Sequence, residues 1–244
     1  MAYQHTFRRY ELKYLITQSQ KETILRHIAP YMHLDQYGRT TIQNIYFDTA
    51  DYRLIRRSIE KPVYKEKLRV RRYGTEDTPV FVELKKKYRQ VVYKRRVAMP
   101  EQAAMDWLVR GLQPFDDSQI CRELAYVAGY YTGLRPTVYL CYDREAYFCE
   151  SIPDFRVTFD DTITARVKDL SFAGGTGGHP ILDSSRVLME LKCAGGLPLW
   201  MVELLSRERI YKTSFSKYGT AYQTLIFPNC KEEIFYGTTV QGHF

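Results

Sequence analysis

The sequence has no long apolar run. Its N-terminus, MAYQHTFRRYELKY, lacks the apolar core of a signal peptide. Nowhere in the 244 residues is there an uninterrupted apolar stretch long enough to span a bilayer. We therefore expect a soluble cytoplasmic protein with no membrane segment of its own.

Several catalytic and metal-binding motifs are also missing. The five cysteines are odd in number and form no Cys-x-x-Cys pair, which argues against a disulfide framework or a thiolate zinc site. The five histidines form no pair at metal-ligand spacing, and there is no Gly-x-Ser-x-Gly nucleophile elbow. The glycine cluster GGTGGHP is not followed by Gly-Lys-Ser/Thr, so it does not match a P-loop. These absences make zinc hydrolase and serine hydrolase chemistry poor hypotheses.

Positive charge is in excess. The formal net charge of +8 indicates an anionic partner, but charge alone does not separate nucleic acid, a membrane and small phosphates. A composition of 45% hydrophobic and 14% aromatic residues is enough to build the core of one large β-rich domain. With no internal linker visible, we predict a single domain over residues 1–244.

The cations are spaced as in β-strands. Read as a strand, KEKLRVRRY places Lys65, Lys67, Arg69 and Arg71 on one face and Glu66, Leu68, Val70 and Arg72 on the other. By itself, such a strand could be a charged edge strand. The same pattern, with cations on one face and aliphatic residues on the other, recurs in FVELKKK, VVYKRRV, VYLCYDREAY and RVLMELKC. A closed sheet with a wet, cationic interior and an apolar exterior covered by helices would satisfy all of these strands together.

The remaining patterns give the order of elements. Alternation predicts strands at Thr6–Ile16, Thr40–Asp48, Val63–Tyr73, Val80–Lys87, Val91–Met99, Pro136–Phe148, Phe155–Asp160 and Arg186–Cys193. Caps and helical periodicity predict helices from Thr17 to near Pro30, at Asp51–Ser58, from Pro100, and at Ser118–Tyr131, Pro198–Ser206 and Ser216–Phe227. The predicted fold is α+β, an antiparallel β-barrel tunnel of about eight strands with helices packed outside.

A cationic tunnel suits polyphosphate chemistry. Phosphoryl transfer needs little covalent help from a protein, because holding the phosphates in line and neutralising their charge is most of the catalysis. Glu11, Glu83 and Glu190 would grip phosphate poorly but are natural oxygen ligands for Mg²⁺ or Mn²⁺ shared with the substrate. As an alternative, Glu83 could pair with Lys85 or Arg96 across the sheet. Any single cation here could also be a solvated surface charge.

An ordered set of motifs resembles a known family. RRYELKYLI, YFDT, KLRVRRYG, FVELKKK, YDREAY, MELKC and SFSKYGTAY together resemble the VTC domain, the catalytic domain of the vacuolar transporter chaperone polyphosphate polymerases. That domain belongs to the triphosphate tunnel metalloenzyme, or CYTH-like, superfamily. The resemblance extends from about Arg8 to Tyr222. It implies ATP and inorganic polyphosphate as partners and Mn²⁺ or Mg²⁺ as cofactor, and a membrane channel for the product would need another protein.

The resemblance also implies roles for individual residues. The cations that would line the tunnel and bind phosphates are Lys13, Arg69, Arg71, Lys85, Lys94, Arg96, Arg144 and Lys192, and Lys67 shares their face. Tyr142 matches a tunnel tyrosine, and Glu190 matches the metal-binding glutamate. Ser216 and Lys217 match a serine and a lysine at the start of the last helix, where free N–H groups attract an anion.

Two positions depart from the family pattern. The superfamily signature Glu-x-Glu-x-Lys appears here as Arg9-x-Glu11-x-Lys13, so a cation replaces the first carboxylate, as in the polymerase branch rather than the hydrolase branch. A lysine expected two residues before Ser216 is Ser214 here, and whether Lys212 replaces it is open at this point.

These features predict an ATP-dependent polyphosphate polymerase that transfers the γ-phosphate of ATP to a growing chain inside the tunnel. One alternative is a metal-dependent tripolyphosphate or nucleoside triphosphate hydrolase, and another is a non-catalytic polyanion- or RNA-binding module. Nucleic-acid binders interleave aromatic side chains with their basic faces, whereas the basic faces here contain only Tyr142 and Phe81. This pattern favours phosphate over bases, so we expect no nucleic-acid partner.

Overall fold

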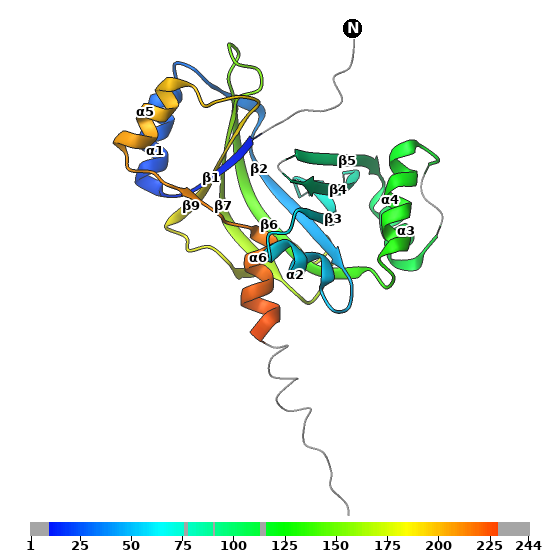
Figure 1. Ribbon diagram of the computed structural model, residues 1–244. Coiled ribbons are helices and arrows are strands. Elements are labelled where there is room, and N and C mark those ends of the chain that lie inside the picture. Colours follow the sequence, from blue (N-terminus) through cyan, green and yellow to red (C-terminus); the bar gives the residue numbers. More distant parts are fainter. Residues whose placement is uncertain (1–9, 76–77, 90, 113–115, 229–244) are drawn as a thin grey trace, which may run out of the picture.

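A computed structural model of the chain describes residues 10–75, 78–89, 91–112 and 116–228 (Figure 1). Arg9, on which the departure from the hydrolase signature rests, lies outside these residues, as do Cys230 and the start of the strand predicted from Thr6. Within the described residues, no helix has both the length and the apolar character needed to cross a bilayer. The domain limits 1–244 stay a prediction.

One antiparallel sheet contains every strand of the described residues. The strands are β1 (Tyr10–Thr17), β2 (His33–Asp48), β3 (Tyr64–Tyr73), β4 (Val80–Tyr88), β5 (Val91–Met99), β6 (Arg135–Phe148), β7 (Arg156–Arg166), β8 (His179–Pro180), β9 (Arg186–Cys193) and β10 (Lys212–Thr213). They pair in the order β10-β1-β9-β7-β6-β2-β3-β4-β5, with β8 paired to β7. Two of these ten strands, β8 and β10, are only two residues long, which leaves eight longer strands. The prediction of about eight antiparallel strands is therefore confirmed.

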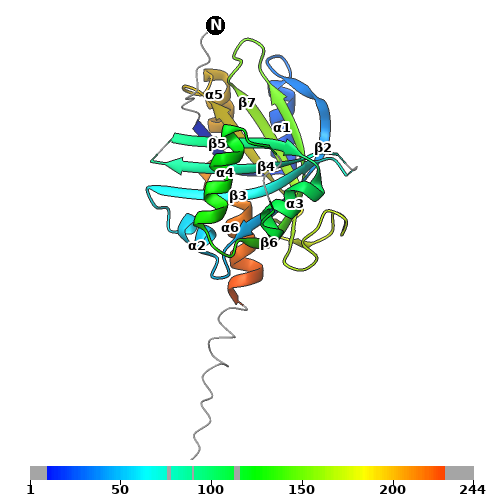
Figure 2. The ribbon, with the colours of Figure 1, turned by 90° about the vertical axis from the view of Figure 1, so that its right-hand side faces the viewer.

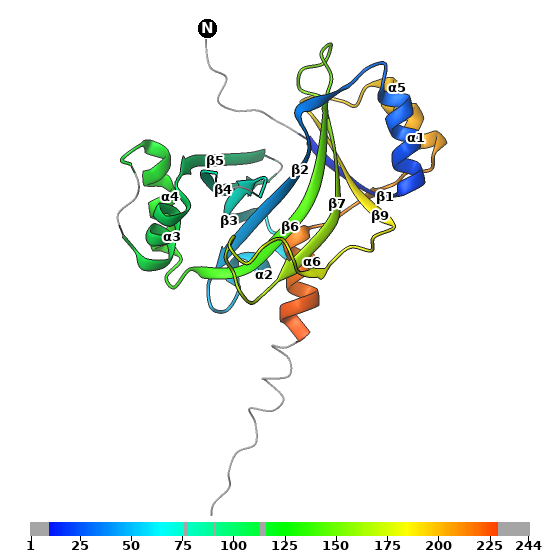
Figure 3. The same cartoon turned by 180° about the vertical axis from the view of Figure 1, so that it is seen from behind.

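The sheet curls, but its hydrogen-bond ladder does not close. Figures 1 and 3 show β1, β9 and β7 on one side, β3, β4 and β5 on the other, and β2 and β6 crossing between them. In the part of the chain that the structure describes, β10 and β5 are the two edges, so the closed sheet expected from the sequence is not formed there. An ion pair between Lys85 of β4 and Glu11 of β1, 2.8 Å long, spans the gap instead. An edge strand exposed to solvent can satisfy its N–H and C=O groups with water, so the fold does not require a closed ladder.

The helices lie outside the curled sheet, as predicted. They are α1 (Gln18–Ile28), α2 (Arg53–Ile59), α3 (Glu101–Arg110), α4 (Gln119–Tyr130), α5 (Leu199–Arg207) and α6 (Lys217–Ala221), which continues as a π-helix over Tyr222–Ile226. Figures 1 and 2 show α1 and α5 together beside β1, β9 and β7, and α3 and α4 beside β3, β4 and β5. Helices α2 and α6 lie next to each other at one end.

The outer faces of the strands make the core. Leu68, Val70, Val82 and Leu84 alternate with the cations of β3 and β4 and are fully buried in one cluster with Trp107 of α3 and Leu124 of α4. A second cluster joins β7 and β9 to α1 and α5. Burying these side chains is the main stabilisation of the fold, at about 1.5–3 kcal/mol for each large residue. In β3 and β4 the strand period thereby directs the apolar residues outward and the cations inward, as the sequence predicted. A third cluster, which includes Leu140 and Leu188, packs against α6 on the face that carries Arg144 and Glu190.

Local signals place the first helix. Thr17 is its N-cap: the Thr17 hydroxyl accepts from the Gln20 N–H at 3.1 Å, and the Gln20 side chain accepts from the Thr17 N–H at 3.0 Å. This reciprocal pair is a capping box. The helix ends at Ile28, close to the predicted end near Pro30.

Two strands are longer than predicted. Strand β2 begins at His33 rather than Thr40, and β7 runs to Arg166 rather than ending at Asp160. Both extensions pair with the long strand β6, and both ladders contain a register shift. A bulge interrupts the period-2 pattern, so alternation in the sequence underestimates strand length there.

Candidate active site

A cavity of about 450 Å³ lies on the cationic inner face of the sheet. Its lining includes Glu11, Lys13, Tyr46, Lys67, Arg69, Arg71, Lys85, Lys94, Tyr142, Arg144, Glu190, Lys192, Ser216, Lys217 and Tyr218. We call it the first cavity. Of the site residues proposed from the sequence, all but Glu83 and Arg96 line it. Glu83 contacts the lining residues Arg69 and Lys94, and Arg96 pairs with Glu83. Strands β1, β3, β4, β5, β6 and β9 and the start of α6 therefore converge on one site.

Glu83 is a buried counter-ion for the cations of β3 and β5. Its side chain is only 2% exposed. One oxygen accepts from Arg69 Nε at 2.9 Å and Nη2 at 2.7 Å, and the other accepts from Arg96 Nε at 2.6 Å and lies 2.8 Å from Lys94 Nζ. Burial alone would raise the pKa of Glu83, but the charges of Arg69, Arg71 and Lys94 hold it well below its usual range. Because a carboxylate offers about four lone-pair sites, these donors fill it, which favours the pairing with Arg96 over metal ligation.

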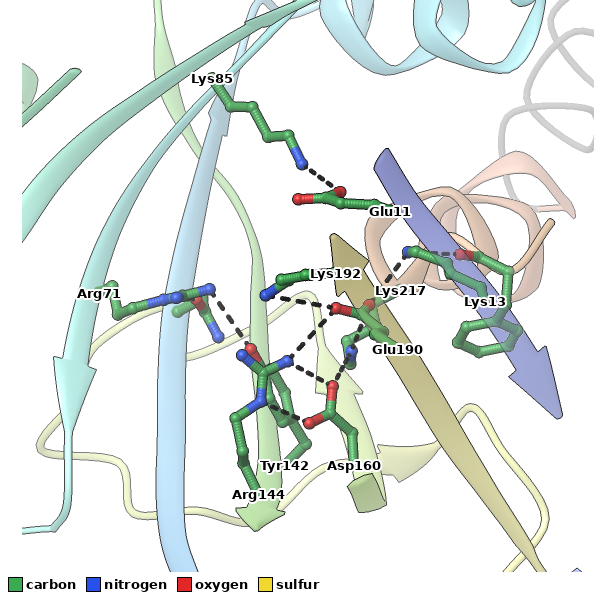
Figure 4. Close-up of polar contacts among 12 residues, drawn as sticks. Glu11, Lys13, Arg71, Lys85, Tyr142, Arg144, Asp160, Glu190, Lys192 and Lys217 are labelled. Carbon is green, nitrogen blue, oxygen red and sulfur yellow. Dashed lines mark hydrogen bonds and ion pairs between the residues drawn. The ribbon is translucent and has the colours of Figure 1, made fainter. Parts of the chain in front are cut away.

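Asp160 of β7 is a second buried counter-ion, and sequence reasoning missed it. Arg144 donates to it as a fork, Nε at 2.6 Å and Nη2 at 2.7 Å, and Lys217 also donates to it (Figure 4). Asp160 is fully buried, and the charges of Arg144 and Lys217 lower its pKa against the effect of burial. The signal was available, because Asp160 alternates with the apolar residues Val157 and Phe159, but the predicted strand ended at this residue.

Glu190 is held more loosely than these two carboxylates. Its oxygens lie 3.2 Å from Lys13, 3.7 Å from Lys217, 3.7 Å from Arg144 and 4.0 Å from Lys192. Burial would raise its pKa, but these surrounding cations lower it well below the usual value. Glu190 is therefore charged, faces the cavity and is not saturated by short hydrogen bonds (Figure 4).

Polar side chains on β2 and β6 orient the two arginines of β3. Arg71 donates to Asn44 at 2.9 Å and to the Tyr142 hydroxyl at 3.3 Å. Arg69 donates to the Tyr46 hydroxyl at 3.0 Å. Asn44 and Tyr46 were not singled out from the sequence, where they are uncharged residues in the mixed polar and apolar β2 strand. They hold the guanidinium groups in fixed directions toward the first cavity.

A second cavity of about 610 Å³ adjoins the first. The two share Glu11, Lys13, Lys67, Lys85, Val92 and Ser216. The second adds four lysines, Lys61, Lys65, Lys87 and Lys212, together with Ser214. Lys212 and Ser214 thus line the second cavity rather than the first. Burial and the charges of Lys87 and Lys61 lower the pKa of Lys65. Among the described residues, none of the four has a carboxylate within 4.0 Å.

The comparison with protein families matches the VTC domain over residues 8–226. The chain belongs to the VTC domain family. The resemblance drawn from its motifs is therefore confirmed. A comparison with curated proteins found no match.

Several solved structures resemble this chain. A proposed adenylate cyclase from Bacillus halodurans is 14% identical, with 88% of this chain and 96% of that chain covered and a TM-score of 0.55. A proposed adenylate cyclase from Vibrio parahaemolyticus is 10% identical over 89% of this chain and 98% of that chain, with a TM-score of 0.49. The PH1819 protein from Pyrococcus horikoshii is 15% identical over 91% of this chain and 98% of that chain, with a TM-score of 0.45. The first of these likenesses shows that the VTC domain shares the architecture of that protein.

The donor set of this VTC domain fits a divalent ion shared with phosphate. No group of three or more His, Cys, Asp or Glu side chains that could hold a metal occurs in residues 10–75, 78–89, 91–112 and 116–228. Mg²⁺ is usually bound by one or two carboxylates, with substrate phosphates and water completing its shell. Glu190 fits this role. Glu11 is its diagonal neighbour across β1 and β9, although it now pairs with Lys85. The charges of Lys85 and Lys192 overcome burial and lower the pKa of Glu11 to about 2.

Lys67 occupies the boundary between the two cavities. It donates to the Ser216 hydroxyl at 3.1 Å, and that hydroxyl also caps α6 by accepting from the Gly219 N–H. Burial, followed by the charges of Lys13 and Lys85, lowers the pKa of Lys67 to about 7. At pH 8 this amine is therefore mostly neutral in the empty protein.

Binding of tripolyphosphate at pH 8 should be coupled to proton uptake by Lys67. A phosphate beside the amine favours its charged form and raises its pKa. Calorimetric titrations in two buffers of different ionisation enthalpy should show greater proton uptake by the wild type than by Lys67→Met, with a difference approaching about one proton. At pH 6 the difference should vanish, because Lys67 is already protonated. Lys86→Met, on the outer face of β4, is the control, and equal uptake by all three proteins at pH 8 would contradict the assignment.

Proposed function

We propose that this VTC domain is an ATP-dependent polyphosphate polymerase that transfers the γ-phosphate of ATP to the end of a growing polyphosphate chain. The observation that supports this proposal best is the continuity of the two cavities. The first offers arginines and lysines fixed by buried carboxylates, next to the loosely held Glu190. The second offers four lysines that have no carboxylate within 4.0 Å among the described residues, and such lysines suit further phosphates along a chain. A hydrolase acting on one triphosphate does not require this second cavity.

The residues of the chain supply position and charge. Transfer forms a bond between a terminal oxygen of the polyphosphate and the γ-phosphorus, and it breaks the bond from that phosphorus to the bridging oxygen, which leaves with ADP. Arg144, Lys13 and Lys192 surround Glu190 and would hold the phosphate oxygens of the reacting group. Glu190 would hold a divalent ion, which would neutralise further charge on the phosphates. Arg69 and Arg71 would hold the adjacent phosphates in line.

Three buried tyrosines of the first cavity, Tyr46, Tyr142 and Tyr218, favour phosphate over nucleic-acid bases, whereas a fourth, Tyr93, is 38% exposed. The Tyr142 ring makes cation–π contacts with Lys217, whose Nζ lies 4.4 Å from the ring centroid, and with Arg144, whose Cζ lies 5.3 Å from it. The Tyr46 ring stacks on Tyr218 with centroids 4.5 Å apart. Binding of single-stranded nucleic acid relies on free aromatic faces for base stacking. These rings are engaged by the protein, so they serve the cations rather than a base.

The proposal is tested by the products made from ATP. Incubation with ATP and Mn²⁺, with a short polyphosphate as primer, should yield ADP and an acid-labile ladder of phosphate chains on a gel. Treatment of the ladder with an exopolyphosphatase should remove it. Release of one free phosphate for each ADP without a ladder would support the triphosphate hydrolase instead. If ATP is not consumed but long polyphosphate binds, the non-catalytic polyanion-binding module is the better reading.

A further inference from the structure

Asp160 lies directly behind two residues that line the first cavity, Arg144 and Lys217. Strand β7 places it between Arg144 of β6 and Leu188 of β9, and its side chain has no exposed surface. It is on the same face of β7 as Thr158, opposite the apolar residues Val157 and Phe159. Because it is fully covered by protein, Asp160 does not itself line the cavity, and any effect on a ligand must pass through its neighbours.

Those neighbours are two cations of the cavity lining. Arg144 binds both Asp160 oxygens through Nε and Nη2, and such a fork fixes the plane of the guanidinium group. Lys217 is pinned to one of the same oxygens. Both cations also lie 3.7 Å from Glu190. Asp160 and Glu190 thus share the same two cations from opposite sides, one buried and one facing the cavity (Figure 4).

We propose that Asp160 is a positioning residue that fixes Arg144 and Lys217 in direction and offsets part of their charge, so that the first cavity releases phosphate more readily than its cations alone would allow. This inference rests on the proposed function. Binding that is equally strong in the ground state and the transition state lowers KM without raising kcat. An enzyme whose product is itself a polyanion must let the chain advance after each transfer. A buried counter-charge limits ground-state affinity, while the fixed geometry preserves alignment in the transition state.

The test compares Asp160→Asn with Asp161→Asn. The neighbouring Asp161 lies on the opposite face of β7, where it pairs with Arg39 and Lys21, so its variant changes net charge equally but outside the cavity. Metal-free tripolyphosphate should bind Asp160→Asn several-fold more tightly than the wild type. The substitution removes one repulsive interaction, between the Asp160 carboxylate and the phosphate, in a partly buried site. The kcat for ATP consumption should fall by about tenfold or more, with no rise in KM. In Asp161→Asn, affinity and kcat should stay within about twofold of the wild type.

A second variant separates charge from geometry. Asp160→Asn combined with Lys217→Met removes one cation along with the carboxylate, which restores the net charge of the wall and avoids an unpaired buried ammonium group. Its tripolyphosphate affinity should return to near that of the wild type while kcat stays low. A merely structural Asp160 would instead give weaker tripolyphosphate binding in both variants, in step with lost thermal stability, and that result would overturn the proposal. If the wild type does not consume ATP, the proposed function fails, whereas the binding comparison still decides the role of Asp160.

Discussion

Replacing Glu190 by glutamine should abolish most turnover while making metal-free tripolyphosphate bind more tightly. We expect kcat to fall by about 10²-fold or more, because a metal ion neutralising transition-state charge is worth several kcal/mol and each 1.36 kcal/mol is a factor of ten. The same substitution removes a negative charge that faces the cavity among Lys13, Arg144, Lys192 and Lys217. Without a metal, that charge repels phosphate. Rate measurements with saturating Mn²⁺ check the loss of kcat, and calorimetry without metal checks the tighter binding of tripolyphosphate.

The empty Glu190→Gln protein should also melt at a lower temperature than the wild type, because four cations lose a shared counter-ion. Glu145→Gln is a matched control: Glu145 pairs with Lys21 and Arg39 in an ionic cluster outside the cavity. It should lose comparable stability but keep its kcat and its affinity for tripolyphosphate. Full activity of Glu190→Gln at saturating metal would remove Glu190 from the mechanism.

The fold was predictable where a local pattern determines it. In β3 the period of two separates Leu68 and Val70 from Arg69 and Arg71, and burial in the structure follows that separation. The capping residues Thr17 and Ser118 likewise mark helix starts that the structure confirms. Closure of the sheet was not predictable in this way. It depends on whether edges far apart in the sequence meet, and neither alternation nor capping carries that information.

The gathering of the cations was likewise readable from the sequence, because a shared face in every strand requires that they point into one space. Their counter-ions were harder to find. Asp160 stands at the predicted end of a strand that continues for six more residues. Asn44 and Tyr46 carry no charge and stand in a strand of mixed polar and apolar residues, where nothing distinguishes them. The sequence also offered two readings of Glu83, as metal ligand and as ion-pair partner. Only the positions of Arg69, Lys94 and Arg96 around it show how fully its oxygens are occupied.

The pKa values of two lysines show that charge in the empty site is not fully balanced. Burial and neighbouring cations lower the pKa of Lys67 to about 7. Burial and the charge of Arg144 lower the pKa of Lys192 to about 8, despite the nearby Glu190. Between pH 7 and about pH 10, the ordinary lysine range, Lys67 is protonated more fully in the unfolded chain than in the native protein. Within this window Lys67 therefore makes the free energy of unfolding rise with pH. Below pH 7 the protonated amine carries its full unfavourable interaction, which a bound polyanion would relieve.

Tripolyphosphate should therefore raise the melting temperature far more than sulfate at equal ionic strength. A ligand that binds only the native state stabilises it by RT ln(1 + [L]/Kd), which is about 2.7 kcal/mol at a hundred times Kd. For a domain of this size that is a rise of roughly 5–10 °C. Sulfate cannot span several cations of a cavity at once, so its effect should be small. Arg71→Ala removes a cation of the first cavity and should reduce the shift at a fixed tripolyphosphate concentration, whereas Arg122→Ala, exposed on α4, should leave it unchanged. Equal shifts with sulfate and tripolyphosphate would mean that the cations act as separate surface charges rather than as one site.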